Sequence, residues 1–215
     1  MATIYTLHPE SPQSFKIDKI RKQLQSGAIM LYATDTVYAI GCDLLSKNAI
    51  KRVRQLKKLS NDKPLTFLCS SLSNIAEYAY VSDPAYRTMR YLVPGPYTFI
   101  LPATKLVPKL VMNPKRKTTG IRVPDSPVCQ ALLQSLGNPI ISTSAHTGDM
   151  DEAYFSRYEL FDALEKQVDI IIDSEAEPSY LASTILDMTE DDPVVIRKGL
   201  GFDAVEQFAT AIVSN

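Results

Sequence analysis

The chain has 215 residues, of which 45% are hydrophobic, and its 23 basic and 24 acidic residues leave a net charge of -1. No apolar run reaches the roughly 18 residues that a membrane span needs, and the N-terminus lacks a signal-peptide core, so we expect a cytoplasmic protein without a membrane partner. The 3 cysteines match no zinc or redox motif, which agrees with a reducing compartment.

Apolar spacing and turn residues predict alternating helices and strands along the chain. In chain order the predicted elements are helix 15–25, strand 28–32, helix 47–59, strand 65–69, helix 83–92, strands 97–101 and 120–123, helix 127–136, strand 140–141, helix 158–167, and strands 168–172, 183–186 and 194–196. We expect Asp83 to cap its helix, and Ser126 and Gly137 to bound the helix between them.

This alternation is typical of an α/β domain, in which helices flank one twisted sheet. The strands at 97–101 and 120–123 follow each other without a helix between them, which predicts a mixed sheet. No linker rich in proline, glycine or serine divides the chain. We therefore expect one domain over residues 1–215, with its core at about 14–201.

Polar side chains gather where the strand at 28–32 ends, since Thr34, Asp35 and Thr36 follow directly. Side chains of this kind at the end of a buried strand face a turn, a helix end or a ligand. Two hydroxyls around a carboxylate could hold a small polar ligand, or Asp35 could cap a turn. Local chemistry leaves both interpretations open.

Other strand ends also present hydroxyls and cations, namely Arg122, Ser142, Thr143, Ser144, Ser183, Thr184 and Arg197. Arginine holds carboxylates and phosphates through paired hydrogen bonds, so one interpretation is a shared anion-binding floor. The other is ordinary capping, which is the commoner role of a single serine at a strand end. The chain has no Walker loop, G-x-G-x-x-G, nucleophile elbow or H-E-x-x-H motif.

Charge is distributed unevenly along the chain. Residues 1–125 contain 19 basic and 8 acidic residues, whereas residues 126–215 contain 4 and 16. The basic half has dense runs at 47–63 and 105–122. This segregation either focuses a positive potential that attracts phosphates or forms two solvated faces that neutralise each other.

Seven stretches, taken together and in order, resemble the motifs of a known family. They are Y-A-T-D-T-V-Y-A-I-G-C-D at 32–43, L-K-K-L-S-N-D-K-P-L at 56–65, P-G-P-Y-T-F-I-L at 94–101, G-I-R-V-P at 120–124, S-T-S-A-H at 142–146, S-T-I-L-D at 183–187 and V-I-R-K-G at 195–199. The chain resembles the YrdC-like family of threonylcarbamoyl-AMP synthases, and within it the YciO branch most closely.

The resemblance implies a single-domain α/β fold: a twisted open mixed sheet with flanking helices and a positively charged concave face. It implies that L-threonine, bicarbonate and ATP react to give threonylcarbamoyl-adenylate, which feeds the threonylcarbamoyladenosine modification of tRNA. ATP is then a substrate, with Mg²⁺ on its phosphates and no tightly bound metal. The alternative is a module that binds tRNA or double-stranded RNA and keeps a vestigial nucleotide site.

The same resemblance assigns roles to individual residues. It implies that the residues in contact with the threonine substrate are Thr34, Thr36, Arg122, Ser142 and Ser183. It implies that the nucleotide-binding residues are Lys57, Lys63, Thr118, Ser144, His146 and Arg197. Of these, Lys57 and Ser144 are the expected catalytic residues.

Three positions depart from the family pattern. The K-x-R motif ends in Leu59, the S-x-N motif ends in His146, and Leu68 stands where a histidine is usual. An arginine beside a reacting phosphate stabilises the transition state by on the order of several kcal/mol. The loss of the arginine at Leu59 therefore predicts weak synthase activity or an altered substrate.

Overall fold

The computed structural model describes residues 1–60, 63–145, 156–175, 177–206 and 211–212. Its strands are β1 (Thr3–Thr6), β2 (Ile29–Ala33), β3 (Tyr38–Asp43), β4 (Thr66–Leu68), β5 (Tyr97–Pro102), β6 (Thr118–Arg122), β7 (Ile140–Ser144), β8 (Ile170–Asp173), β9 (Thr184–Asp187), β10 (Val194–Arg197) and β11 (Ala211–Ile212). Its helices are α1 (Ser14–Gln25), α2 (Lys47–Leu56), α3 (Leu72–Tyr78), α4 (Asp83–Leu92), α5 (Pro127–Leu136), α6 (Arg157–Leu164) and α7 (Phe202–Val205).

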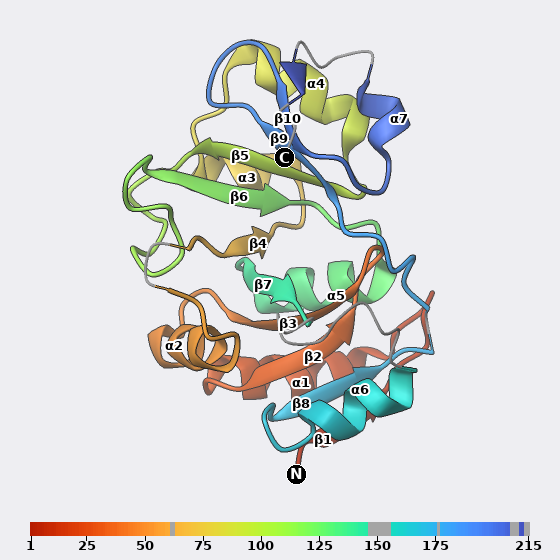
Figure 1. Cartoon of the computed structure of the whole chain (residues 1–215). Coiled ribbons are helices and arrows are strands. Elements are labelled where there is room, and N and C mark those ends of the chain that lie inside the picture. The colour runs from red at the N-terminus through yellow and green to blue at the C-terminus, as the bar shows by residue number, and fades with distance from the viewer. Residues whose placement is uncertain (61–62, 146–155, 176, 207–210, 213–215) are drawn as a thin grey trace.

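The described strands form one mixed sheet in the order β1-β8-β2-β3-β7-β4-β6-β5-β9-β10-β11. The strand β3 pairs antiparallel with β2 and β7, whereas β4 pairs parallel with β6 and β5 pairs parallel with β9. Figure 1 shows the sheet twisting from β1, near the N-terminus, to β9 and β10 at the other end of the molecule. This confirms the predicted fold class.

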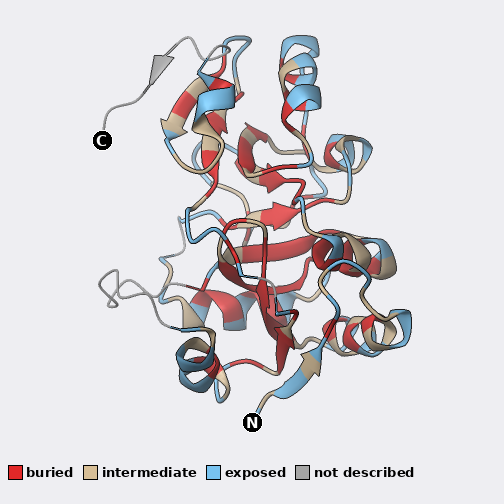
Figure 2. Cartoon of the chain, turned by 90° about the vertical axis from the view of Figure 1, so that its right-hand side faces the viewer, coloured by how far each residue is buried: buried red, intermediate tan, exposed pale blue. Residues whose placement is uncertain are grey.

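Two clusters of buried side chains cover the two faces of the sheet. Along β2, Met30 and Tyr32 pack with α1 and α5, whereas Ile29, Leu31 and Ala33 pack with the cluster that includes α2, α4 and α6. The alternation follows from the two-residue repeat of a strand. Figure 2 shows the resulting pattern, with buried residues on the strands and exposed residues on the outer sides of the helices.

The boundaries of α5 agree with the prediction. The Ser126 side chain accepts a hydrogen bond from the backbone N–H of Cys129 at 3.3 Å, and Gly137 ends the helix with a left-handed φ of 76°. The predicted cap of α4 is wrong by one residue, because Ser82 rather than Asp83 accepts from the backbone N–H of Ala85.

The helix α2 is shorter than predicted. It ends at Leu56, and Lys58 takes a positive φ of 49°, which a helix cannot continue. The segment after Leu56 therefore forms a loop instead of a further helical turn.

The elements β1, β3, α3, α7 and β11 were not predicted. The most important omission is β3, which is buried along its whole length and separates β2 from β7. In the described part of the chain, no helix combines the length and the apolar character that a bilayer crossing requires.

Candidate active site

A cavity of about 670 Å³ lies over the middle of the sheet. Its walls come from the turn between β2 and β3, the loop between α2 and β4, the strands β4 to β7, and the segment around β9 and β10. Ser142 and Ser144 follow Ile140 at two-residue intervals, so they share its side of β7. Because Ile140 packs against α1 and α5, the cavity lies on the same side of the sheet as those two helices.

The cavity brings together most of the residues that were expected to form the site. These are Thr34, Thr36, Lys57, Lys63, Arg122, Ser142, Ser144, Ser183 and Arg197. The structure does not bring Thr118 to the cavity, because this residue begins β6 whereas Arg122 ends it. The predicted nucleotide contact of His146 lies outside the described residues.

The hydroxyl of Thr34 is used entirely within its own turn. It donates to the carbonyl of Val37 at 2.7 Å and accepts from the backbone N–H groups of Thr36 and Val37, both at 3.2 Å. Thr34 Oγ1 also lies 3.0 Å from Thr36 Oγ1. Since the single proton of Thr34 is already committed, Thr36 is the donor in this last bond.

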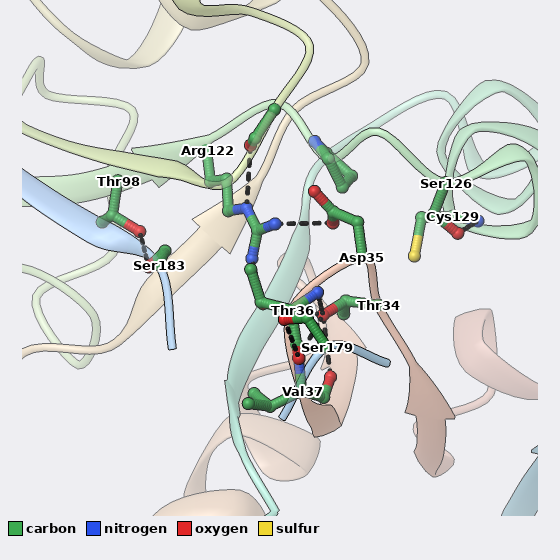
Figure 3. Close-up of polar contacts among 12 residues, drawn as sticks. Thr34, Asp35, Thr36, Val37, Thr98, Arg122, Ser126, Cys129, Ser179 and Ser183 are labelled. Atoms are coloured by element: carbon green, nitrogen blue, oxygen red, sulfur yellow. Dashed lines mark hydrogen bonds and ion pairs between the residues drawn. The ribbon is translucent and has the colours of Figure 1, made fainter. Parts of the chain in front are cut away.

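Arg122 reaches across from the end of β6 to the same turn (Figure 3). Its Nη1 donates to Thr36 Oγ1 at 2.6 Å, its Nε donates to the carbonyl of Gly95 at 3.2 Å, and its Nη2 lies 2.5 Å from Asp35 Oδ1. Asp35 is therefore neither a turn cap nor a lining residue, but the ionic partner of Arg122. Thr36 now accepts from Arg122 and donates to Thr34, so it can only accept a further hydrogen bond from a ligand.

Ser142 has the opposite hydrogen-bonding role to Thr36, because it can donate to a ligand. The phenol of Tyr32, which is completely buried, donates to Ser142 Oγ at 2.8 Å. Burial raises the pKa of Tyr32 above its ordinary value, which keeps the phenol protonated. Because Ser142 accepts from Tyr32, its own proton remains available to donate to a ligand in the cavity.

Tyr32 lies against β3 at a point where only glycine fits. A Cβ at Gly41 would approach both the Tyr32 ring and the carbonyl of Ile141 to 2.8 Å. The absence of a side chain there lets the tyrosine ring cross beneath the cavity and reach Ser142.

A second arginine lies at the end of β10. Arg197 Nη2 donates to the carbonyl of Ser183 at 2.7 Å and to its hydroxyl at 3.1 Å. Thr98 Oγ1 lies 2.8 Å from the same hydroxyl. Figure 3 marks this contact with a dashed line. Burial lowers the pKa of Arg197, and the charge of Arg122 lowers it further. The charges of Arg122 and Arg197 therefore contribute to the same positive electrostatic potential in the cavity.

The loop after α2 supplies the remaining positive charge. Lys57, Lys58 and Lys63 line the cavity together with Leu59, the residue at the arginine position of the K-x-R motif. Burial lowers the pKa of Lys57, and the charge of Lys63 acts in the same direction. No acidic side chain occurs among the described lining residues, so the cavity suits an anionic ligand.

Sequence reasoning missed several polar residues of the site. Thr66 and Thr98 line the cavity, and Tyr32 holds Ser142 without lining it. Leu68, where a histidine was expected from the family pattern, is also part of the lining. The signal for Thr98 was its position in an otherwise apolar buried strand, where an unpaired hydroxyl would be costly.

A comparison with protein families and known proteins supports the resemblance found in the sequence. Residues 22–199 match the model of the Sua5/YciO/YrdC family, which carries the description "Telomere recombination". The uncharacterized protein YciO of Escherichia coli K12 is 39% identical over 204 residues, which cover 94% of this chain and 97% of that protein. A threonylcarbamoyl-AMP synthase of Vibrio vulnificus is 27% identical over 186 residues, which cover 85% of this chain and 98% of that protein.

Solved structures agree with these relatives. The crystal structure of E. coli YciO superposes with a TM-score of 0.89 and 38% identity, covering 97% of this chain and 100% of that one. The crystal structure of Pyrococcus abyssi Sua5 complexed with L-threonine superposes with a TM-score of 0.88 and 25% identity, covering 99% of this chain and 63% of that one.

Proposed function

Since this chain belongs to the Sua5/YciO/YrdC family, we propose that it forms threonylcarbamoyl-adenylate and pyrophosphate from L-threonine, bicarbonate and ATP. The product would serve the threonylcarbamoyladenosine modification of tRNA. The observation that carries this proposal is the convergence of two arginines, three lysines and several hydroxyls in one cavity without an acidic lining residue among those described.

Threonine would bind beside Arg122. A guanidinium has five N–H donors, and Asp35, Thr36 and Gly95 each engage one of its nitrogens, so donors remain for the substrate carboxylate. The acceptor at Thr36 would face the amine or hydroxyl of threonine. The donor at Ser142 and the hydroxyl of Ser183 would face substrate oxygens.

The nucleotide would bind towards the loop after α2. Lys57 and Lys63 would neutralise the phosphates, with Ser144 and Arg197 as further contacts. The reaction begins when the threonine amine takes up bicarbonate, giving a carbamate and water. A carbamate oxygen then attacks the α-phosphorus, the bond to the β-phosphate breaks, and pyrophosphate leaves.

This chemistry needs positioning and charge neutralisation more than it needs a general base. Lys57 and Ser144 are the groups that we assign to the reacting phosphate. The cationic lining would neutralise the negative charge that is spread over the phosphate oxygens in the transition state.

Mg²⁺ would enter as part of the substrate Mg-ATP. No group of three or more His, Cys, Asp or Glu side chains that could hold a metal ion occurs in the described part of the chain. The lining therefore does not fit the oxygen-ligand set that a resident Mg²⁺ prefers, and we assign no step to such an ion. We place the reaction in the cytoplasm, and the three free and buried cysteines support this compartment.

The decisive experiment measures pyrophosphate release from Mg-ATP in the presence of bicarbonate. It is run with and without threonine, for the wild type and for Leu59→Arg. Leu59→Met is the matched control, since it changes shape without adding charge. We expect slow threonine-dependent release in the wild type and at least about tenfold faster release in Leu59→Arg, because the added fork contacts phosphate. Absence of threonine-dependent release from both proteins would reject the synthase proposal.

A second function, binding of tRNA or double-stranded RNA, is supported by the position of the loop between β5 and β6. The carbonyl of Val111 in this loop accepts from the backbone N–H of Leu65 at 3.0 Å, which holds the loop beside the mouth of the cavity. The loop carries the exposed cations Lys105, Lys109, Lys115 and Lys117. The two basic runs of the sequence are therefore neighbours in the fold, as phosphate-backbone binding requires.

Filter binding of tRNA at two salt concentrations tests this second function. Neutralisation of two exposed lysines, in Lys105→Gln/Lys109→Gln, should weaken binding and flatten its salt dependence. Binding that is absent or insensitive to salt would count against an RNA role, whatever the result of the pyrophosphate assay.

A further inference from the structure

We propose that Arg54, which does not line the cavity, is the residue that positions its nucleotide half. Arg54 lies on the inner side of α2 and is only 6% exposed. Its Nη1 donates to the carbonyl of Lys63 at 2.9 Å and to the carbonyl of Leu110 at 3.0 Å, and its Nη2 donates to the carbonyl of Ser60. This inference rests on the proposed function, since it concerns the same nucleotide site.

The three carbonyls belong to the two basic loops at the mouth of the cavity. Ser60 and Lys63 lie in the loop between α2 and β4, and Leu110 lies in the loop between β5 and β6. One buried guanidinium thus joins both loops to the end of α2. The backbone N–H of Leu59 also donates to the carbonyl of Arg54 at 3.0 Å, so the same residue holds the loop from both directions.

The choice of arginine has a physical reason. A guanidinium presents its donors in a planar fork and can reach three acceptors at once, whereas a lysine ammonium is a point charge on a flexible stem. In the described part of the chain, no carboxylate forms an ion pair with Arg54. Removal of this guanidinium would leave three loop carbonyls without their donor, so we assign its role to the geometry of the loops.

The loop held by Arg54 includes much of the lining that the proposed nucleotide site uses. Lys57, Leu59, Ser60 and Lys63 all face the cavity. The threonine half, by contrast, is built on β6, β7 and the turn between β2 and β3, which Arg54 does not contact. Loss of Arg54 should therefore weaken nucleotide binding and spare threonine binding.

The test compares Arg54→Met and Arg54→Lys with Arg52→Met. Arg52 is a suitable control because it lies on the same helix but pairs with Asp169, on the surface, at 2.7 Å. The first measurement is amide hydrogen exchange of the ligand-free proteins. The backbone N–H groups of Leu59, Lys63 and Leu65, which all have backbone acceptors, should exchange faster in both Arg54 variants and at the wild-type rate in Arg52→Met.

The second measurement is equilibrium binding of Mg-ATP and of L-threonine by calorimetry. In Arg54→Met the Kd for Mg-ATP should rise about tenfold to a hundredfold, while that for threonine stays within about twofold. Arg54→Lys should resemble Arg54→Met, because a lysine ammonium keeps the charge but cannot form the three hydrogen bonds of the planar guanidinium group. A purely structural role would weaken both ligands equally.

Each outcome separates this inference from the proposed function. Unchanged exchange in the loop of Arg54→Met would overturn the positioning role, whether or not ATP binds. Faster exchange with unchanged ATP affinity, or equal loss of ATP and threonine affinity, would overturn it as well. A wild type that binds no Mg-ATP would reject the nucleotide site itself, and then only the loop-anchoring result would stand.

Discussion

The carboxylate of Asp35 and the guanidinium of Arg122 form an enclosed ion pair, with Nη2 and Oδ1 2.5 Å apart and only 13% and 6% of the respective side chains exposed. The two carboxylate oxygens and Nη2 have no other hydrogen-bond partner within the described chain. Breaking such a pair on one side leaves a buried charge without compensation. The turn between β2 and β3 is thereby joined electrostatically to the end of β6.

The variant Asp35→Asn tests the energetic importance of this pair. We expect the free energy of unfolding to fall by about 3 kcal/mol, because Arg122 stays buried while its ionic partner is removed. Urea denaturation measures this change. Asp18→Asn, on the exposed side of α1, is the matched control and should leave the urea midpoint unchanged. Equal midpoints for the two variants would mean that the ion pair contributes nothing to folding.

Arg122→Lys tests the assignment of the threonine subsite. A lysine keeps the charge but cannot engage Asp35, Thr36 and Gly95 while also holding a carboxylate. The Kd for threonine should rise at least about tenfold, whereas that for Mg-ATP should change by less than about threefold. Calorimetry with both ligands gives the comparison, and Arg116→Lys, at the surface ion pair with Asp187, serves as the control. A variant that binds threonine as well as the wild type would show that the carboxylate lies elsewhere.

Tyr32→Phe removes the hydrogen bond that Ser142 accepts from Tyr32 and that directs the Ser142 proton towards the ligand. The loss of one buried hydrogen bond should lower the free energy of unfolding by about 1 kcal/mol. Without the phenol, Ser142 can turn its proton away from the ligand, so we expect the threonine Kd to rise by about threefold to tenfold. Tyr5→Phe, which loses a bond to Gln23 outside the cavity, should affect stability at most and not threonine binding. A wild-type threonine Kd in Tyr32→Phe would remove Tyr32 from the site.

The lowered pKa of Lys57 predicts a pH dependence of nucleotide binding. Burial and the charge of Lys63 lower this pKa in the ligand-free protein, and a bound phosphate raises it again. Affinity for Mg-ATP should therefore be complete below the lowered pKa and should fall as the pH rises through it, earlier than for an ordinary lysine at about 10.4. Calorimetry over a pH series that rises to the ordinary pKa of lysine follows this fall. Lys57→Arg should abolish it, since arginine stays charged; an identical fall in that variant would locate the titrating group elsewhere.

Local signals in the sequence were sufficient wherever a boundary depends on a few neighbouring residues. Ser126 and Gly137 mark the two ends of α5 because a cap and a left-handed glycine act on the adjacent turn. Where the local signal was ambiguous, the prediction was wrong. Residues 57–59 continue the apolar spacing of α2, yet Lys58 leaves the helix with a positive φ and begins the loop that Arg54 holds.

The motifs predicted most of the residues that line the cavity, but not how these residues hold one another. Arg122 was expected to contact threonine, and the fold also pairs it with Asp35 and Thr36, the latter 86 residues away in the sequence. No pattern within a short window indicates such a pairing. It depends on the order of the strands in the sheet.

The sequence by itself determined the α/β class, most of the strands and helices, and the set of polar side chains at strand ends, because each depends on residues only a few positions apart. Tertiary structure alone decided that β3 lies between β2 and β7, that Tyr32 and Arg122 give Ser142 and Thr36 opposite hydrogen-bond polarity, and that one buried arginine joins two basic loops. These relationships arise from packing between distant segments, where burial forces every polar group to find a partner that the local sequence does not specify.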